Sequence, residues 1–136
     1  RQQEPEKKRP AIWKASGTIL LVDDEDMVRF PARRALEMSG LTVLEAVDGL
    51  EAVDIFREHA DEIDVVLMDM TMPRMNGPEA FEQIIRIKSD ARVILSSGYS
   101  ESDATSQFAD ASLAGFIQKP YRPSELIAKL RGVMEG

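Results

Sequence analysis

Two short apolar runs in this chain each end abruptly in acidic residues. Thr18–Val22 is followed by four consecutive acids, and Ile63–Met68 is followed by Asp69. A continuous apolar run of this length, without polar alternation, is typical of a β-strand that is buried on both faces. Such strands occur in parallel sheets that carry helices on both sides, because each face must be covered. The two runs therefore predict an α/β fold.

Extended and helical patterns alternate along the rest of the chain. Three more strands are predicted at Leu41–Glu45, Val93–Leu95 and Phe116–Ile117. A polar helix is predicted around Ser102–Ala111. Four further helices are predicted from apolar residues at helical spacing, namely Val28, Ala32, Ala35 and Leu36; Ala52, Val53 and Phe56; Phe81, Ile84 and Ile85; and Leu126, Ile127, Leu130, Val133 and Met134. Five strand–helix alternations predict one doubly wound, five-stranded parallel sheet with helices on both faces.

Composition and charge exclude several classes of site. The 136-residue chain has no cysteine and one histidine, which excludes disulfides, thiolate metal sites and multi-histidine zinc sites. No apolar run approaches the roughly 18 residues of a membrane-spanning helix. Residues 1–16 carry a net charge of +3 and residues 17–136 a net charge of −10. We therefore expect a charged linker or tail at 1–16, a single domain at 17–136, and no nucleic-acid binding by that acidic domain. Because the chain opens with Arg1 and not with Met, we also expect it to be a fragment of something larger.

Polar residues follow four of the predicted strands. In an open parallel sheet, ligands bind beyond the carboxyl ends of the strands, near the point where the strand order reverses. The polar residues in these places are Asp23, Asp24 and Glu25 after the first strand, Asp69 after the third, Ser96 and Ser97 after the fourth, and Lys119 after the fifth. We expect them to share one edge of the sheet.

Three clustered aspartates repel one another unless a cation neutralises them. Oxygen ligands of this kind suit Mg²⁺, and Lys119 supplies a further positive charge. A small anion that bridges the metal, the lysine and a hydroxyl completes the charge balance, and a phosphoryl group fits that description. Taken singly, each residue has a plainer interpretation, since Asp24 or Asp26 would serve as a helix N-cap and Asp69 as a turn cap. Their joint occurrence at successive strand ends favours a site for phosphoryl transfer to or from a carboxylate.

Four segments in this order resemble the receiver domain of two-component response regulators: LLVDDED, VVLMDMTMPRMNG, VILSSGYS and GFIQKPYRP. The resemblance covers about residues 17–134. It implies a flavodoxin-like fold with strand order 2-1-3-4-5. It also implies that Asp69 is the phospho-acceptor, and that Asp23, Asp24, Asp69 and the backbone carbonyl of Thr71 bind Mg²⁺.

The resemblance assigns roles to three further residues. Ser97, rather than Ser96, matches the switch hydroxyl that binds phosphate, and Lys119 matches the phosphate-pairing lysine. Phe116 matches the switch aromatic, whose ring would turn inward on phosphorylation and change the surface of the fourth helix, fifth strand and fifth helix. Three departures from the family pattern are serine in place of the more frequent threonine at 97, phenylalanine in place of the alternative tyrosine at 116, and Pro31 within the first helix.

The segments SSGYS and AGFIQKPYRPSEL are similar in sequence to those of receivers at the C-terminus of hybrid sensor histidine kinases. This similarity implies a cytoplasmic module of a phosphorelay, phosphorylated by a histidine kinase or a histidine phosphotransfer domain. Its parent protein would be a hybrid kinase, of a kind that can be anchored in a membrane, and the domain itself would not contact that membrane. The domain alone is not expected to turn over as an enzyme. We expect a monomer, or a weak homodimer formed through the surface of the fourth helix, fifth strand and fifth helix.

Other functions remain as alternatives. One is a free-standing, single-domain response regulator that acts as a phosphate sink or partner switch. Another is a small Mg²⁺-dependent phosphohydrolase resembling the haloacid dehalogenases, but those enzymes need a second acid two residues after the nucleophile, where this chain has Thr71. A scaffold that works without phosphorylation is disfavoured by the complete set of acids, serine and lysine. Nucleotide binding is disfavoured because neither a GxGxxG motif nor a P-loop is present.

Overall fold

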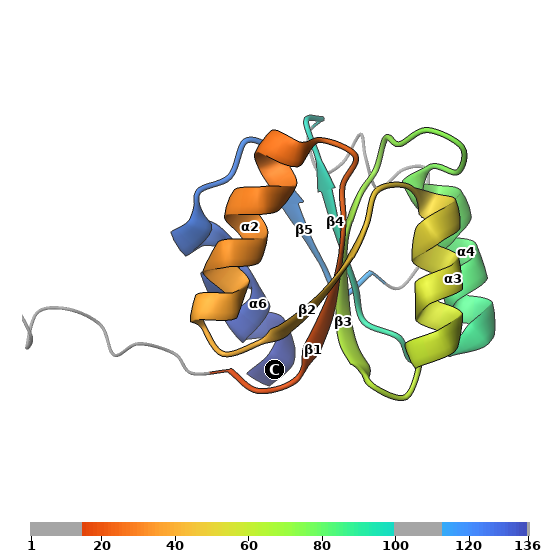
Figure 1. The fold of residues 1–136 in the computed structure, drawn as a ribbon, viewed down its shortest axis with the longest axis horizontal. Coiled ribbons are helices and arrows are strands. Elements are labelled where there is room, and N and C mark those ends of the chain that lie inside the picture. The colour runs from red at the N-terminus through yellow and green to blue at the C-terminus, as the bar shows by residue number, and fades with distance from the viewer. Residues whose placement is uncertain (1–14, 100–112, 136) are drawn as a thin grey trace, which may run out of the picture.

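Five parallel strands form a single sheet in the order β2-β1-β3-β4-β5 (Figure 1). The computed structural model describes residues 15–99 and 113–135. Its strands are β1 (Thr18–Val22), β2 (Thr42–Ala46), β3 (Ile63–Asp69), β4 (Val93–Ser97) and β5 (Gly115–Gln118). The predicted doubly wound sheet and its strand order are confirmed. The helix predicted around Ser102–Ala111 and nearly all of the tail predicted at 1–16 lie outside the described residues.

β3 and β4 continue past their predicted carboxyl ends, and both of these extensions consist of polar residues. β3 includes Asp69, and β4 includes both Ser96 and Ser97. Asp69 pairs with Ser96 in the sheet register, and the Met70 amide donates to the Ser96 carbonyl at 2.9 Å. The ladder therefore continues past the apolar run, because backbone hydrogen bonds do not depend on side-chain polarity.

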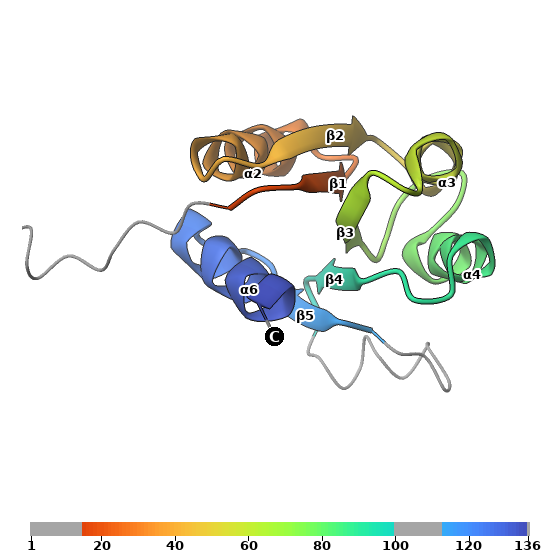
Figure 2. The same cartoon turned by 90° about the horizontal axis from the view of Figure 1, so that it is seen from below.

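The helices cover the sheet as two pairs (Figure 2). α2 (Asp26–Met38) and α6 (Pro123–Glu135) lie on one face, and α3 (Gly49–His59) and α4 (Gly77–Ile87) lie on the other. Within the described residues, no helix is both long and apolar enough to cross a membrane.

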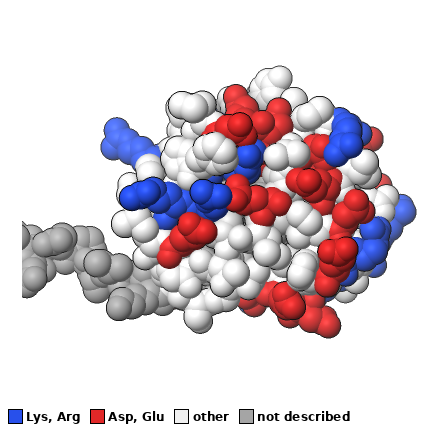
Figure 3. Space-filling view, viewed as in Figure 1, with Lys and Arg blue, Asp and Glu red and all other residues white. Residues whose placement is uncertain are grey.

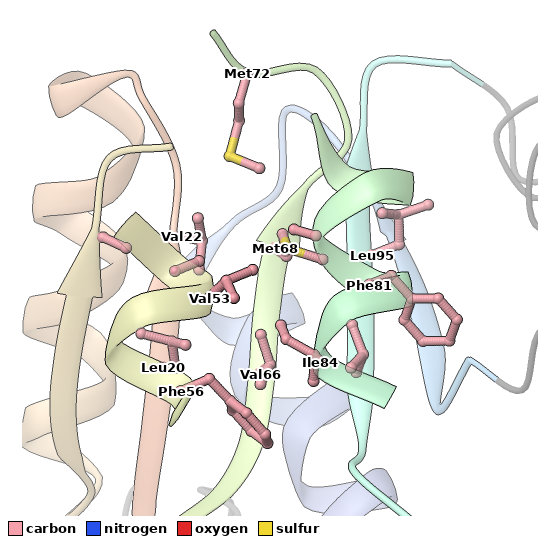
Figure 4. Close-up of a cluster of buried hydrophobic side chains, with 14 of the residues drawn as sticks. Leu20, Val22, Val53, Phe56, Val66, Met68, Met72, Phe81, Ile84 and Leu95 are labelled. Carbon is pink, nitrogen blue, oxygen red and sulfur yellow. The ribbon is translucent and has the colours of Figure 1, made fainter. Parts of the chain in front are cut away.

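Side chains of the central strands alternate between two buried cores. Leu20 and Val66 pack with Phe56 and Ile84 beneath α3 and α4 (Figure 4). The residues between them on the strands, such as Leu21, belong to the second core, beneath α2 and α6. This alternation explains why the strands read as continuous apolar runs in the sequence.

α2 runs through Pro31, whose side chain is exposed. Proline lacks the backbone N–H that would bond to the carbonyl four residues earlier, so one helical hydrogen bond is missing here. The structure does not explain why proline occurs at this position of the helix.

Candidate functional site

The carboxyl edge of the sheet brings together acids from β1 and β3. Asp23 directly follows β1 and is 2% exposed, and Asp69 is the last residue of β3 and is 6% exposed. The Asp23 amide donates to the Ala46 carbonyl at 3.1 Å, and its Oδ1 accepts from the Glu25 amide at 2.9 Å. Both carboxylates therefore lie in a poorly hydrated environment, and that of Asp23 is also held by a backbone amide.

Asp24 completes a group of three aspartates. Asp23, Asp24 and Asp69 each offer a carboxylate oxygen, and these oxygens lie within 4.8 Å of one another. Asp24 is exposed, unlike the other two. The N-cap of α2 is Glu25, and no side chain caps this helix, so neither Asp24 nor Asp26 has the capping role considered above. A hard divalent cation suits this arrangement, because three oxygen ligands converge and one side of the group faces solvent.

Lys119 reaches the same group from the end of β5. Its Nζ lies 3.0 Å from Asp23 Oδ2, 3.0 Å from Glu25 Oε1 and 3.4 Å from Asp69 Oδ1. The peptide bond between Lys119 and Pro120 is cis. One ammonium is thus shared among three carboxylates.

The pKa values of the site follow from this crowding. Burial raises the pKa of Asp69 to about 6, the charge of Asp23 adds to the rise, and Lys119 opposes it. The pKa of Asp23 is also raised, mainly by burial, against the opposing effects of the Glu25 amide and Lys119. Burial alone would lower the pKa of Lys119, but its hydrogen bond to Asp23, the charge of Asp69 and its hydrogen bond to Glu25 together raise it. Lys119 therefore stays protonated, and Asp69 lacks a cation of its own.

Ser97 lies at the same edge, as the buried last residue of β4. Its Oγ accepts a hydrogen bond from the Tyr99 amide at 3.0 Å. Its carbonyl accepts from the Lys119 amide at 2.7 Å, which fixes the ends of β4 and β5 to each other. The hydroxyl hydrogen is free to rotate toward another acceptor.

The structure is less specific about two predicted residues. Thr71 lies two residues beyond Asp69 with an exposed side chain, and the role of its carbonyl stays a prediction. Phe116 is already 9% exposed and packs in the core beneath α3 and α4. In this conformation the ring has little apolar area left to bury, and its role as a switch stays a prediction.

Two arginines near the site were not identified from the sequence. Arg29 is buried on α2 and contacts the backbone of Asp23. Arg74, in the loop after β3, donates from Nε to Asp48 Oδ2 at 2.7 Å. The spacing of Asp26 and Arg29, three residues apart on one helix, is a sequence signal for the ion pair between these two residues but not for the contact with Asp23. The contact between Arg74 and Asp48 joins residues 26 positions apart and leaves no local signal.

The profile of the family described as "Response regulator receiver domain" matches residues 19–131. The chain belongs to this family. The receiver domain is 37% identical over 120 residues to the sensor kinase CckA of Brucella abortus, covering 88% of this chain and 13% of that kinase. It is 38% identical over 120 residues to the response regulator UvrY of Escherichia coli K12, covering 87% of this chain and 54% of UvrY. The chain thus spans only part of each relative.

A solved structure described as the receiver domain of the hybrid histidine kinase CckA has the same fold. The TM-score is 0.73 at 34% sequence identity, and the match covers 87% of this chain and 99% of that one. Receiver domains are phosphorylated and bind Mg²⁺ at an acidic pocket, and the three aspartates form such a cluster here. The three aspartates are therefore the candidate for the acidic pocket of this receiver domain.

Proposed function

We propose that this receiver domain takes a phosphoryl group from a phosphohistidine onto Asp69. The observation that carries the proposal is the environment of this carboxylate, which is buried, has a pKa raised to about 6, and lies 3.4 Å from the ammonium of Lys119. A nucleophile held beside a fixed positive charge is the arrangement that in-line phosphoryl transfer requires.

The bonds made and broken involve only Asp69 and the donor. An oxygen of Asp69 forms the new P–O bond while the P–N bond to the donor imidazole breaks. The imidazole nitrogen leaves with the bonding electron pair, and the histidine emerges neutral because its other ring nitrogen carries a proton. Lys119 neutralises a phosphoryl oxygen, and the Ser97 hydroxyl turns from its present surroundings to donate to another.

Mg²⁺ fits the same edge. We propose that Asp23, Asp24, Asp69 and the backbone carbonyl of Thr71 hold it, since the three carboxylates already converge. When bound, the ion offsets the negative charge of the acids and of the phosphoryl group.

The donor domain has a contact surface beside the site. A hollow of about 440 Å³ opens next to Lys119, between α2 and the segment that links β5 to α6. Its lining is largely apolar and includes Met27, Pro31, Pro120 and Tyr121. We propose that a histidine kinase or histidine phosphotransfer domain docks here. Acidic side chains are spread over the face shown in Figure 3, and the net charge is −7, which disfavours nucleic acid as a partner.

We also propose that residues 17–136 are the receiver part of a hybrid sensor histidine kinase in the cytoplasm, with 1–16 as its linker. The similarity to CckA supports this origin. The equally high identity to UvrY supports the alternative of a separate response regulator. A monomer or weak homodimer, and a switch through Ser97 and Phe116, remain predictions.

The test is phosphorylation by a small donor such as acetyl phosphate in the presence of Mg²⁺. We expect one alkali-labile phosphoryl group in the wild type and none in Asp69→Asn, because the amide is not a nucleophile. The matched control is Asp54→Asn, which changes an exposed aspartate on α3. Label that persists in Asp69→Asn, or that survives mild alkali, would contradict the proposal.

A further inference from the structure

Arg29 is buried although it is an arginine in the first part of a surface helix. Its side chain is 8% exposed and lies between the end of β1 and the edge strand β2. Nη1 donates to the Asp23 carbonyl at 2.7 Å, Nη2 to Asp26 Oδ1 at 2.6 Å, and Nε to Glu45 Oε1 at 3.0 Å. The planar guanidinium thus joins three segments through three separate nitrogens.

The contact with Asp23 matters because of the peptide to which that carbonyl belongs. The same peptide unit carries the amide of Asp24, so its orientation determines the direction in which Asp24 leaves β1. The Asp23 amide is tied to Ala46, and its carboxylate is tied to the Glu25 amide and to Lys119. The carbonyl is the remaining polar group of Asp23, and Arg29 holds it.

The first turn of α2 is not capped by the side chain of its N-cap residue, Glu25. Helix starts are usually held by such a bond. Here Arg29 reaches back from the first turn and fixes the strand end instead.

We propose that Arg29 is a positioning residue for the metal site, because it holds the Asp23–Asp24 peptide so that the two carboxylates converge on one ion. This inference rests on the proposed function, which places Mg²⁺ at Asp23, Asp24 and Asp69.

A positioning role and a purely electrostatic role predict opposite changes. Arg29 carries a positive charge close to the acids, and a nearby cation weakens the binding of another cation. If charge were its only effect, its removal would strengthen Mg²⁺ binding. If it positions the peptide, its removal weakens Mg²⁺ binding. The sign of the change therefore separates the two roles.

Arg33 provides a matched control on the same helix. Its Nη1 donates to Glu45 Oε2 at 2.8 Å, so it shares one partner with Arg29. No contact joins it to Asp23. Arg33→Gln removes one positive charge and one bond to Glu45 but leaves the strand end intact.

The experiment is a Mg²⁺ titration of the full chain by calorimetry, with denaturant unfolding of each variant alongside. We expect Arg29→Gln to raise the Kd for Mg²⁺ on the order of tenfold, as for other residues that orient metal ligands, and Arg33→Gln to change it less than about twofold. Arg29→Lys keeps the charge and leaves Asp26 and Glu45 a cation to pair with, but one ammonium does not reproduce the three directed bonds. We expect it to fold and to bind Mg²⁺ about fivefold more weakly.

A second readout needs no metal. In the metal-free protein, the amide NMR signals of Asp24 and Glu25 should shift or broaden in Arg29→Lys and stay in place in Arg33→Gln. Unchanged or tighter Mg²⁺ binding in folded Arg29→Lys would overturn the inference. Asp24→Asn in the same titration tests the site itself: if it leaves Mg²⁺ binding unchanged, the proposed metal site fails, and with it the basis of the inference.

Discussion

Two buried aspartates at the same edge of the sheet have pKa values that are shifted in opposite directions. Asp48, just after β2, is 3% exposed and has a lowered pKa, whereas Asp69, at the end of β3, is 6% exposed and has a pKa raised to about 6. Burial alone raises the pKa of both carboxyl groups. Burial therefore does not explain the difference between them.

The difference lies in how each carboxylate is partnered. Asp48 has partners of its own, since Oδ1 accepts from the Glu51 amide at 2.8 Å and Oδ2 from Arg74 at 2.7 Å. Asp69 shares the ammonium of Lys119 with two other carboxylates and lies further from it than they do. The charges of two neighbouring aspartates also raise its pKa. A satisfied buried acid stabilises a helix start and a loop, whereas an unsatisfied one is available for chemistry.

Removal of the shared cation should have the largest effect. We expect Lys119→Ala to slow phosphorylation by a small donor on the order of a hundredfold, because it deletes the charge that faces the phosphoryl group. The pKa of Asp69 should rise further, since Lys119 now lowers it. Phosphorylation kinetics and carboxyl NMR titration measure the two effects. The control is Lys129→Ala, an exposed lysine on α6, and equal rates for the two variants would contradict the assigned role.

Replacement of Asp48 should have a somewhat smaller effect, and it should lower the stability of the fold rather than the rate of phosphorylation. Asp48→Ala loses a helix N-cap and an ion pair, so we expect the free energy of unfolding at pH 7 to fall by about 2.5 kcal/mol. Because the pKa of Asp48 is lowered, its ionised form stabilises the fold above its ordinary pKa of about 4, and this is lost as the pH falls through the lowered value. The difference in free energy of unfolding between the wild type and Asp48→Ala should therefore be smaller at acidic pH. Denaturant unfolding at both pH values tests this against Asp54→Ala, and equal stability of the two variants would remove the distinction.

Neutralisation of the unsatisfied acid should have a smaller effect of opposite sign. With a raised pKa, Asp69 binds its proton more tightly in the folded state, so the free energy of unfolding is higher in acid and falls as the pH rises from about 4 to about 6. Asp69→Asn lacks this penalty. Without Mg²⁺, we expect it to be about 2 kcal/mol more stable than the wild type at pH 8 and nearly equal at pH 4. A destabilised Asp69→Asn at pH 8 would show that the carboxylate is satisfied after all.

Sequence reasoning predicted that the acids at the strand ends converge with Lys119, but it did not find the partner of Asp48. Asp23, Asp69 and Lys119 each follow a recognisable strand, and parallel strands of known polarity bring their ends to one edge. Their convergence was therefore predictable from the alternation of elements. The partner of Asp48 could not be found in this way, because Arg74 lies on a different loop, 26 positions away in the sequence.

The burial of individual side chains could not be predicted from the sequence. Arg29 reads as an ordinary solvated residue of an amphipathic helix, and its burial depends on Glu45 lying opposite on β2. The burial of Phe116 likewise depends on the residues of the core that pack around its ring. Both outcomes depend on tertiary contacts between segments, which local patterns do not encode.

Lys119 comes after all of the clustered aspartates in the sequence, so during synthesis the aspartates are made before the lysine that pairs with them. β5 is an edge strand and is hydrogen-bonded to β4, so it joins the sheet after the other strands have been synthesised. A nascent chain that has emerged only through β4 already contains the aspartates but lacks the ammonium that they share. During synthesis, the acidic edge therefore exists first as a crowded cluster of like charges, and it gains its counter-charge only when the last strand docks.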